Sequence, residues 1–183
     1  MKIGIAGCSG TGKSILADKL SQALSIPFLP SKEITGEILR RDGYDYASGQ
    51  QIEKFLATEE HQMEILKKTS EQQSDVEEFV SDRTAIDLAA YAIIEMDGPL
   101  RVKKYVEQCH KLAQVYTHIV FCPWEDKEIV DNKKRTLDPW YQFTVHSVQL
   151  GVMQRFGINC TMMKEADADE RVKTLVSCLK PLD

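Results

Sequence analysis

The chain has 183 residues, a formal net charge of −5, 43% hydrophobic residues and 28% charged residues. This length fits a single domain spanning residues 1–183, which can bury a core without disulfide bonds or structural metal ions. Ordinary apolar content excludes a disordered chain. The acidic balance, without any basic block, excludes a general nucleic-acid partner but leaves room for phosphate binding at one local site.

The sequence also indicates the compartment. No apolar run approaches the roughly 20 residues that a membrane-spanning helix needs, so we expect no membrane partner. The first apolar run is short and leads directly into glycines, unlike a secretory signal. The five cysteines are odd in number and contain no Cys-x-x-Cys pair. This usage fits a reducing compartment and predicts a cytoplasmic protein.

Short apolar runs alternate with longer amphipathic stretches. In chain order we predict a strand over 2–6, a helix over 14–24, a strand over 26–29, a helix over 32–41, one long surface helix over 52–72 and a strand over 78–81. There follow helices over 86–96 and 102–115, a strand over 117–122, a charged loop over 125–139, a helix over 140–156, a strand over 158–163 and a helix over 169–179. This alternation predicts a three-layer α/β/α fold with a mainly parallel, five-stranded sheet.

The strongest motif follows the first predicted strand. Residues 7–14 read Gly-Cys-Ser-Gly-Thr-Gly-Lys-Ser and match G-x-x-x-x-G-K-[ST], the phosphate-binding P-loop, at every fixed position. Glycines let backbone N–H groups approach phosphate oxygens, and the helix that follows points its positive end at the same ligand. Lys13 would neutralise the terminal phosphates of ATP, and the Ser14 hydroxyl suits Mg²⁺. The predicted ATP-binding residues are Gly7, Ser9, Gly10, Thr11, Gly12, Lys13, Ser14 and Ile15.

A second polar segment follows the predicted strand over 78–81. Asp82 is placed to hold Mg²⁺ with Ser14, directly or through water, because the carboxyl ends of neighbouring parallel strands gather around the ligand. Arg83 would grip a phosphate or another anionic group of the substrate. Local sequence also allows Asp82 to cap the next helix and Arg83 to form a surface ion pair. Asp87 would orient Arg83, contact the substrate, or lie on a solvated helix face.

These features resemble the small P-loop nucleoside and nucleotide kinases. The P-loop, the segment Val-Ser-Asp-Arg-Thr-Ala-Ile-Asp over 80–87 and a late basic loop are similar to nicotinamide riboside kinases and, next, to thymidylate and deoxynucleoside monophosphate kinases. The resemblance covers most of the chain in the order of elements, with the P-loop as its most specific part. It implies a P-loop NTPase fold with a short lid. Dimers are common among such kinases, so a homodimer is one expected assembly.

The resemblance also implies residues on the acceptor side. Glu33 would be the base that takes the acceptor's proton, and Lys32 a contact for an anionic group, although both also fit the first turn of a surface helix. The lid is expected over 125–139. Within it, Arg135 would stabilise charge on the transferred phosphoryl group, with Lys133 and Lys134 as alternatives to Arg135. The same charged run also fits a solvated surface loop without a catalytic role. Arg155 on the next helix is a weaker candidate.

The leading hypothesis is therefore a Mg²⁺- and ATP-dependent kinase acting on a small molecule, a nucleoside or nucleoside monophosphate by resemblance. Its predicted catalytic residues are Lys13, Glu33, Arg83 and Arg135, its substrate-binding residues Lys32, Glu33, Arg83 and Asp87, and its metal ligands Ser14 and Asp82. The alternatives are an NTPase that drives a partner and a regulatory nucleotide-binding domain without turnover. No Asp-x-x-Gly or Asn-Lys-x-Asp sequence is present, which argues against a GTPase.

Overall fold

The computed structural model describes residues 1–45, 48–125 and 138–179. Five strands form one sheet in the order β2-β3-β1-β4-β5, and every neighbouring pair is parallel. The strands are β1 (Lys2–Ala6), β2 (Phe28–Leu29), β3 (Phe79–Ser81), β4 (His118–Phe121) and β5 (Thr161–Met162). The predicted parallel, five-stranded sheet is confirmed.

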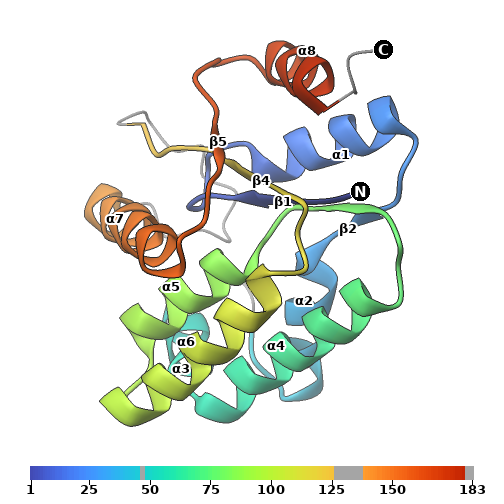
Figure 1. The fold of residues 1–183 in the computed structure, drawn as a ribbon. Helices are drawn as coiled ribbons and strands as arrows, with labels where there is room; N and C mark the ends of the chain where they lie inside the picture. The colour runs from blue at the N-terminus through green and yellow to red at the C-terminus, as the bar shows by residue number, and fades with distance from the viewer. Residues whose placement is uncertain (46–47, 126–137, 180–183) are drawn as a thin grey trace.

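Helices cover both faces of this sheet (Figure 1). They are α1 (Lys13–Leu24), α2 (Ser31–Arg41), α3 (Gly49–Leu56), α4 (Glu59–Ser74), α5 (Ala85–Glu95), α6 (Pro99–Ala113), α7 (Pro139–Phe156) and α8 (Ala168–Leu179). Helices α1 and α8 pack side by side on one face, while α5 contacts both α6 and α7 on the other. A separate apolar cluster fills each side, which confirms the three-layer architecture.

The central strand β1 is buried on both faces. Ile3 and Ile5 lie in the cluster beneath α1 and α8. Gly4 points to the opposite side, where a Cβ atom would lie 2.6 Å from Cγ2 of Thr84 and 2.9 Å from the ring of Tyr116. A glycine is therefore needed for the start of α5 to approach the strand this closely. The same approach brings α5 to the end of the strand where the P-loop begins.

One predicted element is wrong. The expected single helix over 52–72 is two helices, because α3 ends at Leu56 and α4 begins at Glu59. Thr58 between them has an extended backbone (φ −85°, ψ 121°), and Glu59 and Glu60 occupy the first turn of α4. Acidic residues are favourable at a helix N-terminus, so the local sequence supports a new start here. The turn lets Phe55 of α3 pack into the core.

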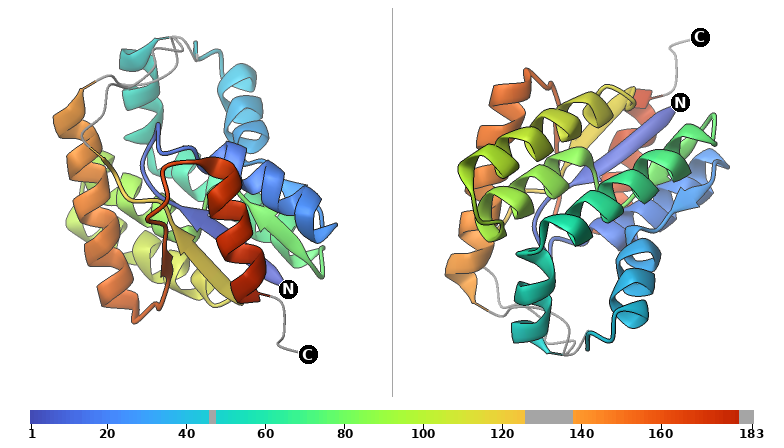
Figure 2. Two further views of the ribbon diagram at one scale, coloured as in Figure 1. Left: turned by 90° about the horizontal axis from the view of Figure 1, so that it is seen from above. Right: turned by 90° about the horizontal axis from the view of Figure 1, so that it is seen from below.

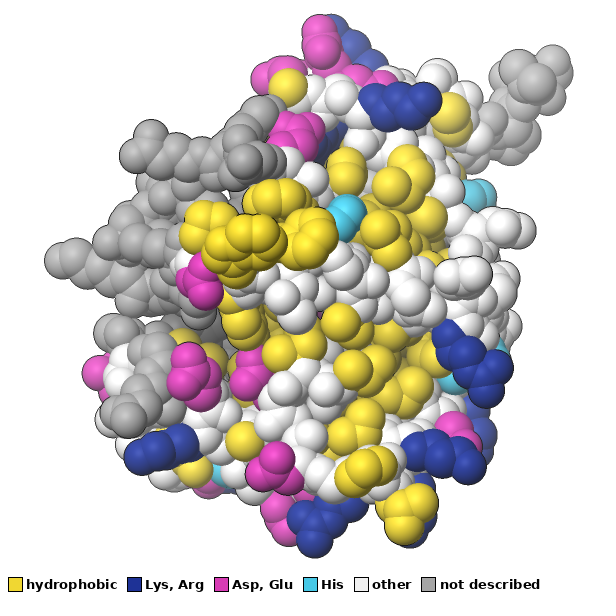
Figure 3. All heavy atoms as spheres, turned by 90° about the vertical axis from the view of Figure 1, so that its left-hand side faces the viewer, with side chains coloured by type: hydrophobic (Ala, Val, Ile, Leu, Met, Phe, Trp, Pro, Cys, Tyr) yellow, Lys and Arg dark blue, Asp and Glu magenta, His cyan; other side chains and the backbone are white. Residues whose placement is uncertain are grey.

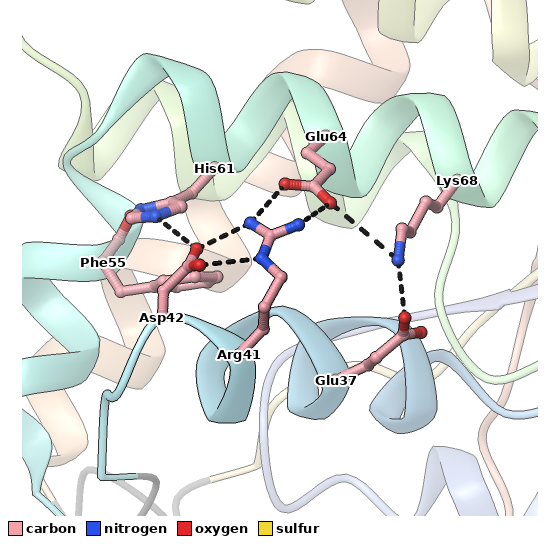
Figure 4. Close-up of polar contacts among 7 residues, drawn as sticks. All are labelled: Glu37, Arg41, Asp42, Phe55, His61, Glu64 and Lys68. Atoms are coloured by element: carbon pink, nitrogen blue, oxygen red, sulfur yellow. Dashed lines mark hydrogen bonds and ion pairs between the residues drawn. The ribbon is translucent and has the colours of Figure 1, made fainter.

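The end of α2 is tied to α4 by a polar network (Figure 4). The Arg41 guanidinium donates to both oxygens of Glu64 at 2.6 and 2.8 Å and to both oxygens of Asp42 at 2.7 Å. His61 of α4 stacks on Phe55 and contacts Asp42 at 3.1 Å. Exposed ion pairs contribute little singly, but a forked guanidinium fixes orientation. The network holds α2 in place, and the first turn of α2 belongs to the site described below.

The face of the molecule on which α7 lies carries apolar side chains (Figure 3). Trp140 and Phe143 of α7 pack edge to face, and Phe143 contacts Trp124 in the same manner at 5.7 Å between ring centroids. Trp124 follows β4, so this contact joins the two sides of the expected lid. Within the residues that the structure describes, no helix is both long enough and apolar enough to cross a membrane.

Candidate active site

The P-loop joins the end of β1 to the start of α1 (Figure 2). Gly7 has a φ of 144°, and a Cβ atom there would lie 2.4 Å from the carbonyl oxygen of Cys122, so only glycine fits. Gly12 is the N-cap of α1 in the left-handed conformation (φ 83°, ψ 9°). The first turn of α1 contains no acidic residue. Its positive N-terminus is therefore left for an anion, as phosphate binding requires.

The side chain of Lys13 lies along this loop. Its Nζ atom donates a hydrogen bond to the carbonyl oxygen of Cys8 at 2.6 Å, and Thr11 Oγ1 donates to the same oxygen at 3.0 Å. Burial lowers the pKa of the Lys13 ammonium, while the nearby Asp87 carboxylate opposes that effect. An anionic phosphate is a stronger partner for this buried cation than the carbonyl oxygen that holds it here.

Asp82 links the P-loop to α2. Its Oδ2 atom accepts a hydrogen bond from Ser14 Oγ at 2.6 Å. Its Oδ1 atom accepts two, from the backbone N–H of Ser31 at 2.9 Å and from Ser31 Oγ at 2.8 Å. The side chain is only 4% exposed. Burial raises the pKa of Asp82, but these hydrogen bonds and the charge of Arg83 outweigh it, so the pKa lies below its usual value.

The oxygen atoms of Asp82 and Ser14 are suitable ligands for a hard cation. A carboxylate and a hydroxyl oxygen lie in direct contact at the foot of the P-loop, and Mg²⁺ is commonly held by one or two such oxygens together with substrate phosphates. Among the described residues, no group of three or more His, Cys, Asp or Glu side chains gathers as a self-sufficient metal site. The residues therefore fit Mg²⁺ delivered with a nucleotide better than a permanently bound ion.

The alternative role for Asp82 as a helix cap is wrong, because Thr84 caps α5. The Thr84 side chain accepts the Ile86 N–H at 3.1 Å, and Asp87 accepts in return from the Thr84 N–H at 2.7 Å. This reciprocal arrangement is a capping box, for which Thr-x-x-Asp is the sequence signal. It leaves Asp82 available for the site.

Asp87 lies neither on a solvated helix face nor at a surface that a substrate could contact. Its side chain is 1% exposed, and both carboxylate oxygens accept hydrogen bonds from within the protein. The expectation of substrate contact is corrected on this point, because the capping box turns the side chain inward. Arg83 places its guanidinium over the Tyr91 ring at 5.2 Å, and its positive charge acts to lower the pKa values of both Lys13 and Asp87.

Lys32 and Glu33 are exposed on the first turn of α2, immediately after Ser31, and their acceptor roles stay predictions. Arg135 and its alternatives Lys133 and Lys134 lie outside the described residues, as does most of the expected lid. Arg155 is exposed in the last turn of α7, which leads back toward the start of β5 and away from the P-loop.

Sequence reasoning missed Arg171 of α8, which is only 7% exposed. Its Nη1 atom donates to the carbonyl oxygen of Thr11 in the P-loop at 2.9 Å, and its Nε atom donates to the carbonyl oxygen of Glu165 at 2.6 Å. No local pattern marks this residue, because its partner in the loop lies 160 positions away. It secures the back of the P-loop to α8.

Replacing Arg171 with methionine is expected to lower the free energy of unfolding by about 2 kcal/mol, because two hydrogen bonds from a charged donor are lost at a buried position. Urea denaturation followed by circular dichroism measures this change. Lys173→Met, at an exposed position of the same helix, is the matched control and should change stability little. Equal stability of the two variants would contradict the role given to Arg171.

His146 of α7 predicts a pH dependence of stability. Burial lowers its pKa from the usual 6.5, and its Nδ1 atom accepts the N–H of Trp124 at 3.3 Å. Below pH 6.5 the unfolded chain therefore binds more protons here than the folded protein, so stability falls as the pH falls toward the folded pKa. His146→Asn keeps an acceptor but does not titrate. Urea unfolding at pH 7.5 and 5.5 should show a smaller loss in the variant, and an identical loss would exclude His146.

A family model and several solved structures match this chain. The family model described as AAA domain matches residues 2–171. No protein of curated function matches significantly in sequence. Among solved structures, deoxyadenosine kinase from M. mycoides, with dCMP and dCDP bound, has a TM-score of 0.70 and 16% identity over 100% of both chains.

Two other solved structures share the fold. NadR protein in complex with NR has a TM-score of 0.68 and 14% identity over 96% of this chain, which spans only 50% of that chain. Shikimate kinase from Aquifex aeolicus has a TM-score of 0.55 and 20% identity over 98% of this chain and 96% of that one. At these identities the likeness concerns the fold. The chain belongs to the AAA domain family and has the fold of the P-loop nucleoside and nucleotide kinases.

Proposed function

We propose that this protein transfers the γ-phosphoryl group of ATP to a small-molecule acceptor, a nucleoside or a nucleoside monophosphate. The observation that carries the proposal is the position of Asp82, whose two oxygens contact Ser14 of the P-loop and Ser31 of α2. The phosphate-donor side and the element that begins with Ser31 thus share one buried carboxylate. The proposed acceptor residue Glu33 lies on the first turn of that same element.

Each residue has a separate task in the proposed reaction. Ser14 and Asp82 would hold Mg²⁺, which neutralises phosphate charge when bound. Lys13 would bind the terminal phosphates, and Arg83 would hold the acceptor's anionic group or the transferred phosphoryl group. Glu33, on the exposed first turn of α2, would accept the proton of the attacking hydroxyl. Such sites act mainly by positioning and charge stabilisation, with Arg135 of the lid as the candidate for the latter.

A nucleoside or nucleotide is favoured as acceptor because of the solved neighbours. Deoxyadenosine kinase was solved with dCMP and dCDP bound, and NadR with NR. Shikimate kinase, however, shares the fold and was solved with shikimate in its Acinetobacter baumannii form, so a non-nucleotide alcohol belongs in the same test.

The test is ADP release from Mg-ATP in the presence of single candidate acceptors: the nucleosides, the deoxynucleosides, their monophosphates, nicotinamide riboside and shikimate. Release that depends on one acceptor, with the phosphorylated product identified by mass spectrometry, supports the proposal. Release at one rate regardless of acceptor would indicate an NTPase instead. Binding of Mg-ATP without any release would indicate a regulatory domain and overturn the proposal.

A further inference from the structure

The buried carboxylate of Asp87 joins three parts of the protein. Its Oδ1 atom accepts the backbone N–H of Gly7 at 3.1 Å and Nε2 of Gln149 at 3.0 Å. Its Oδ2 atom accepts the backbone N–H and the hydroxyl of Thr84 at 2.7 and 2.8 Å. The donors come from the end of β1, the middle of α7 and the cap of α5. A capping box needs only the contacts to Thr84, so the contacts of Oδ1 call for another explanation.

We infer that Asp87 is a positioning residue of the ATP site, which holds the first amide of the P-loop in place with the support of Gln149. This inference rests on the proposed use of the P-loop for ATP. Gly7 sets the direction in which the loop leaves β1. The carbonyl oxygen of Cys122 lies so close to Gly7 that the backbone cannot shift toward it. A hydrogen bond from its amide to a buried carboxylate therefore holds the amides that follow in register for phosphate.

Gln149 supports this arrangement from α7. Its side chain is fully buried, and its Oε1 atom has no hydrogen-bond partner within the described part of the chain. An unpaired buried carbonyl lowers stability, and a leucine of similar size would avoid it. The amide is therefore best explained by its Nε2 bond to Asp87. Without that bond, Oδ1 of Asp87 would keep only the Gly7 amide as a donor.

The experiment measures Mg-ATP binding by calorimetry at one pH, which requires no acceptor and no turnover, together with thermal unfolding of each variant. Gln149→Leu removes one of the two donors to Oδ1 of Asp87, so the carboxylate that holds the Gly7 amide is less constrained. We expect the affinity for Mg-ATP to drop about threefold to tenfold.

Gln73→Leu is the matched control. Gln73 is similarly buried, but it lies near the end of α4, where its carbonyl oxygen accepts from Lys2 at the end of β1 opposite the P-loop. It should leave the affinity for Mg-ATP unchanged. Wild-type affinity in Gln149→Leu would overturn the inference, and so would an equal loss of affinity in Gln73→Leu. If the wild type binds Mg-ATP and Gln149→Leu weakens that binding, but no acceptor is phosphorylated, the proposed function fails while the role of Asp87 stands.

Discussion

Replacing Lys13 with methionine is expected to reduce phosphoryl transfer by at least about 10²–10³-fold, the size of effect seen when one preorganised donor to a developing anion is removed. Methionine matches the length of the lysine stem but has no charge. Lys13 contacts the loop through a single hydrogen bond to the Cys8 carbonyl oxygen, so the fold should survive its loss. ADP release in the presence of the identified acceptor measures the rate, and thermal unfolding measures the fold.

The matched control for this variant is Lys19→Met on the same helix. Lys19 pairs with Asp169 of α8 at 2.5 Å on the surface. Exposed pairs of this kind contribute little to stability, and no contact between this pair and a candidate site residue is found within the described ranges. Lys19→Met should therefore retain the wild-type rate. A Lys13→Met variant that keeps its rate would mean that the P-loop does not bind the transferred phosphate.

Replacing Asp82 with asparagine is expected to reduce the rate of phosphoryl transfer about as much as Lys13→Met does, because the variant would bind Mg²⁺ more weakly. The amide oxygen can still accept from both donors of Ser31, and the amide nitrogen can donate to Ser14 Oγ. The local hydrogen bonds therefore remain possible while the charge that would bind the metal is lost. We expect a steep loss of rate that added Mg²⁺ partly restores, measured as the rate against Mg²⁺ concentration.

The Asp82→Asn variant also distinguishes the contribution of Asp82 to stability from its proposed role in Mg²⁺ binding. The pKa of Asp82 lies below its usual value of 3.8, so its contribution to stability is full above that pH and is lost as the pH falls through the folded pKa. Wild type and Asp82→Asn should thus differ in stability at neutral pH and converge in acid. Ser31→Ala, which removes one hydroxyl donor, should lower stability by about 1 kcal/mol and leave the Mg²⁺ dependence unchanged. A shifted Mg²⁺ dependence in Ser31→Ala would contradict the assignment of the metal to Asp82 and Ser14.

Much of the fold was predictable because the signals are local. The strand over 2–6 and the helix that follows the P-loop agree with β1 and α1, because an apolar run with glycines after it and regular apolar spacing both act over a few residues. The meeting of Ser14 and Asp82 was predictable for a topological reason. Both follow the carboxyl ends of parallel strands that are neighbours in the sheet, so the sheet itself brings them together.

The break between α3 and α4 at Thr58 could not be predicted from the local sequence. Both helices have good helix formers, and the sequence contains neither glycine nor proline between them. Where one helix ends was decided by the packing of Phe55 against Tyr44 and His61, which are on other elements. A pattern of apolar residues gives the face of each helix but not the direction of the next one.

By itself the sequence determined the phosphate-binding loop, because its chemistry uses backbone amides and side chains within eight consecutive residues. It also determined the parallel α/β sheet, through the alternation of short apolar runs and amphipathic stretches. Only the tertiary structure decided what surrounds that loop. Asp87 is buried and accepts hydrogen bonds from Gly7 and Gln149, and Arg171 donates a hydrogen bond to the carbonyl oxygen of Thr11. These contacts join residues 62 to 160 positions apart. These hydrogen bonds are strong because both partners are buried away from water, and burial cannot be predicted from a local pattern of residue types.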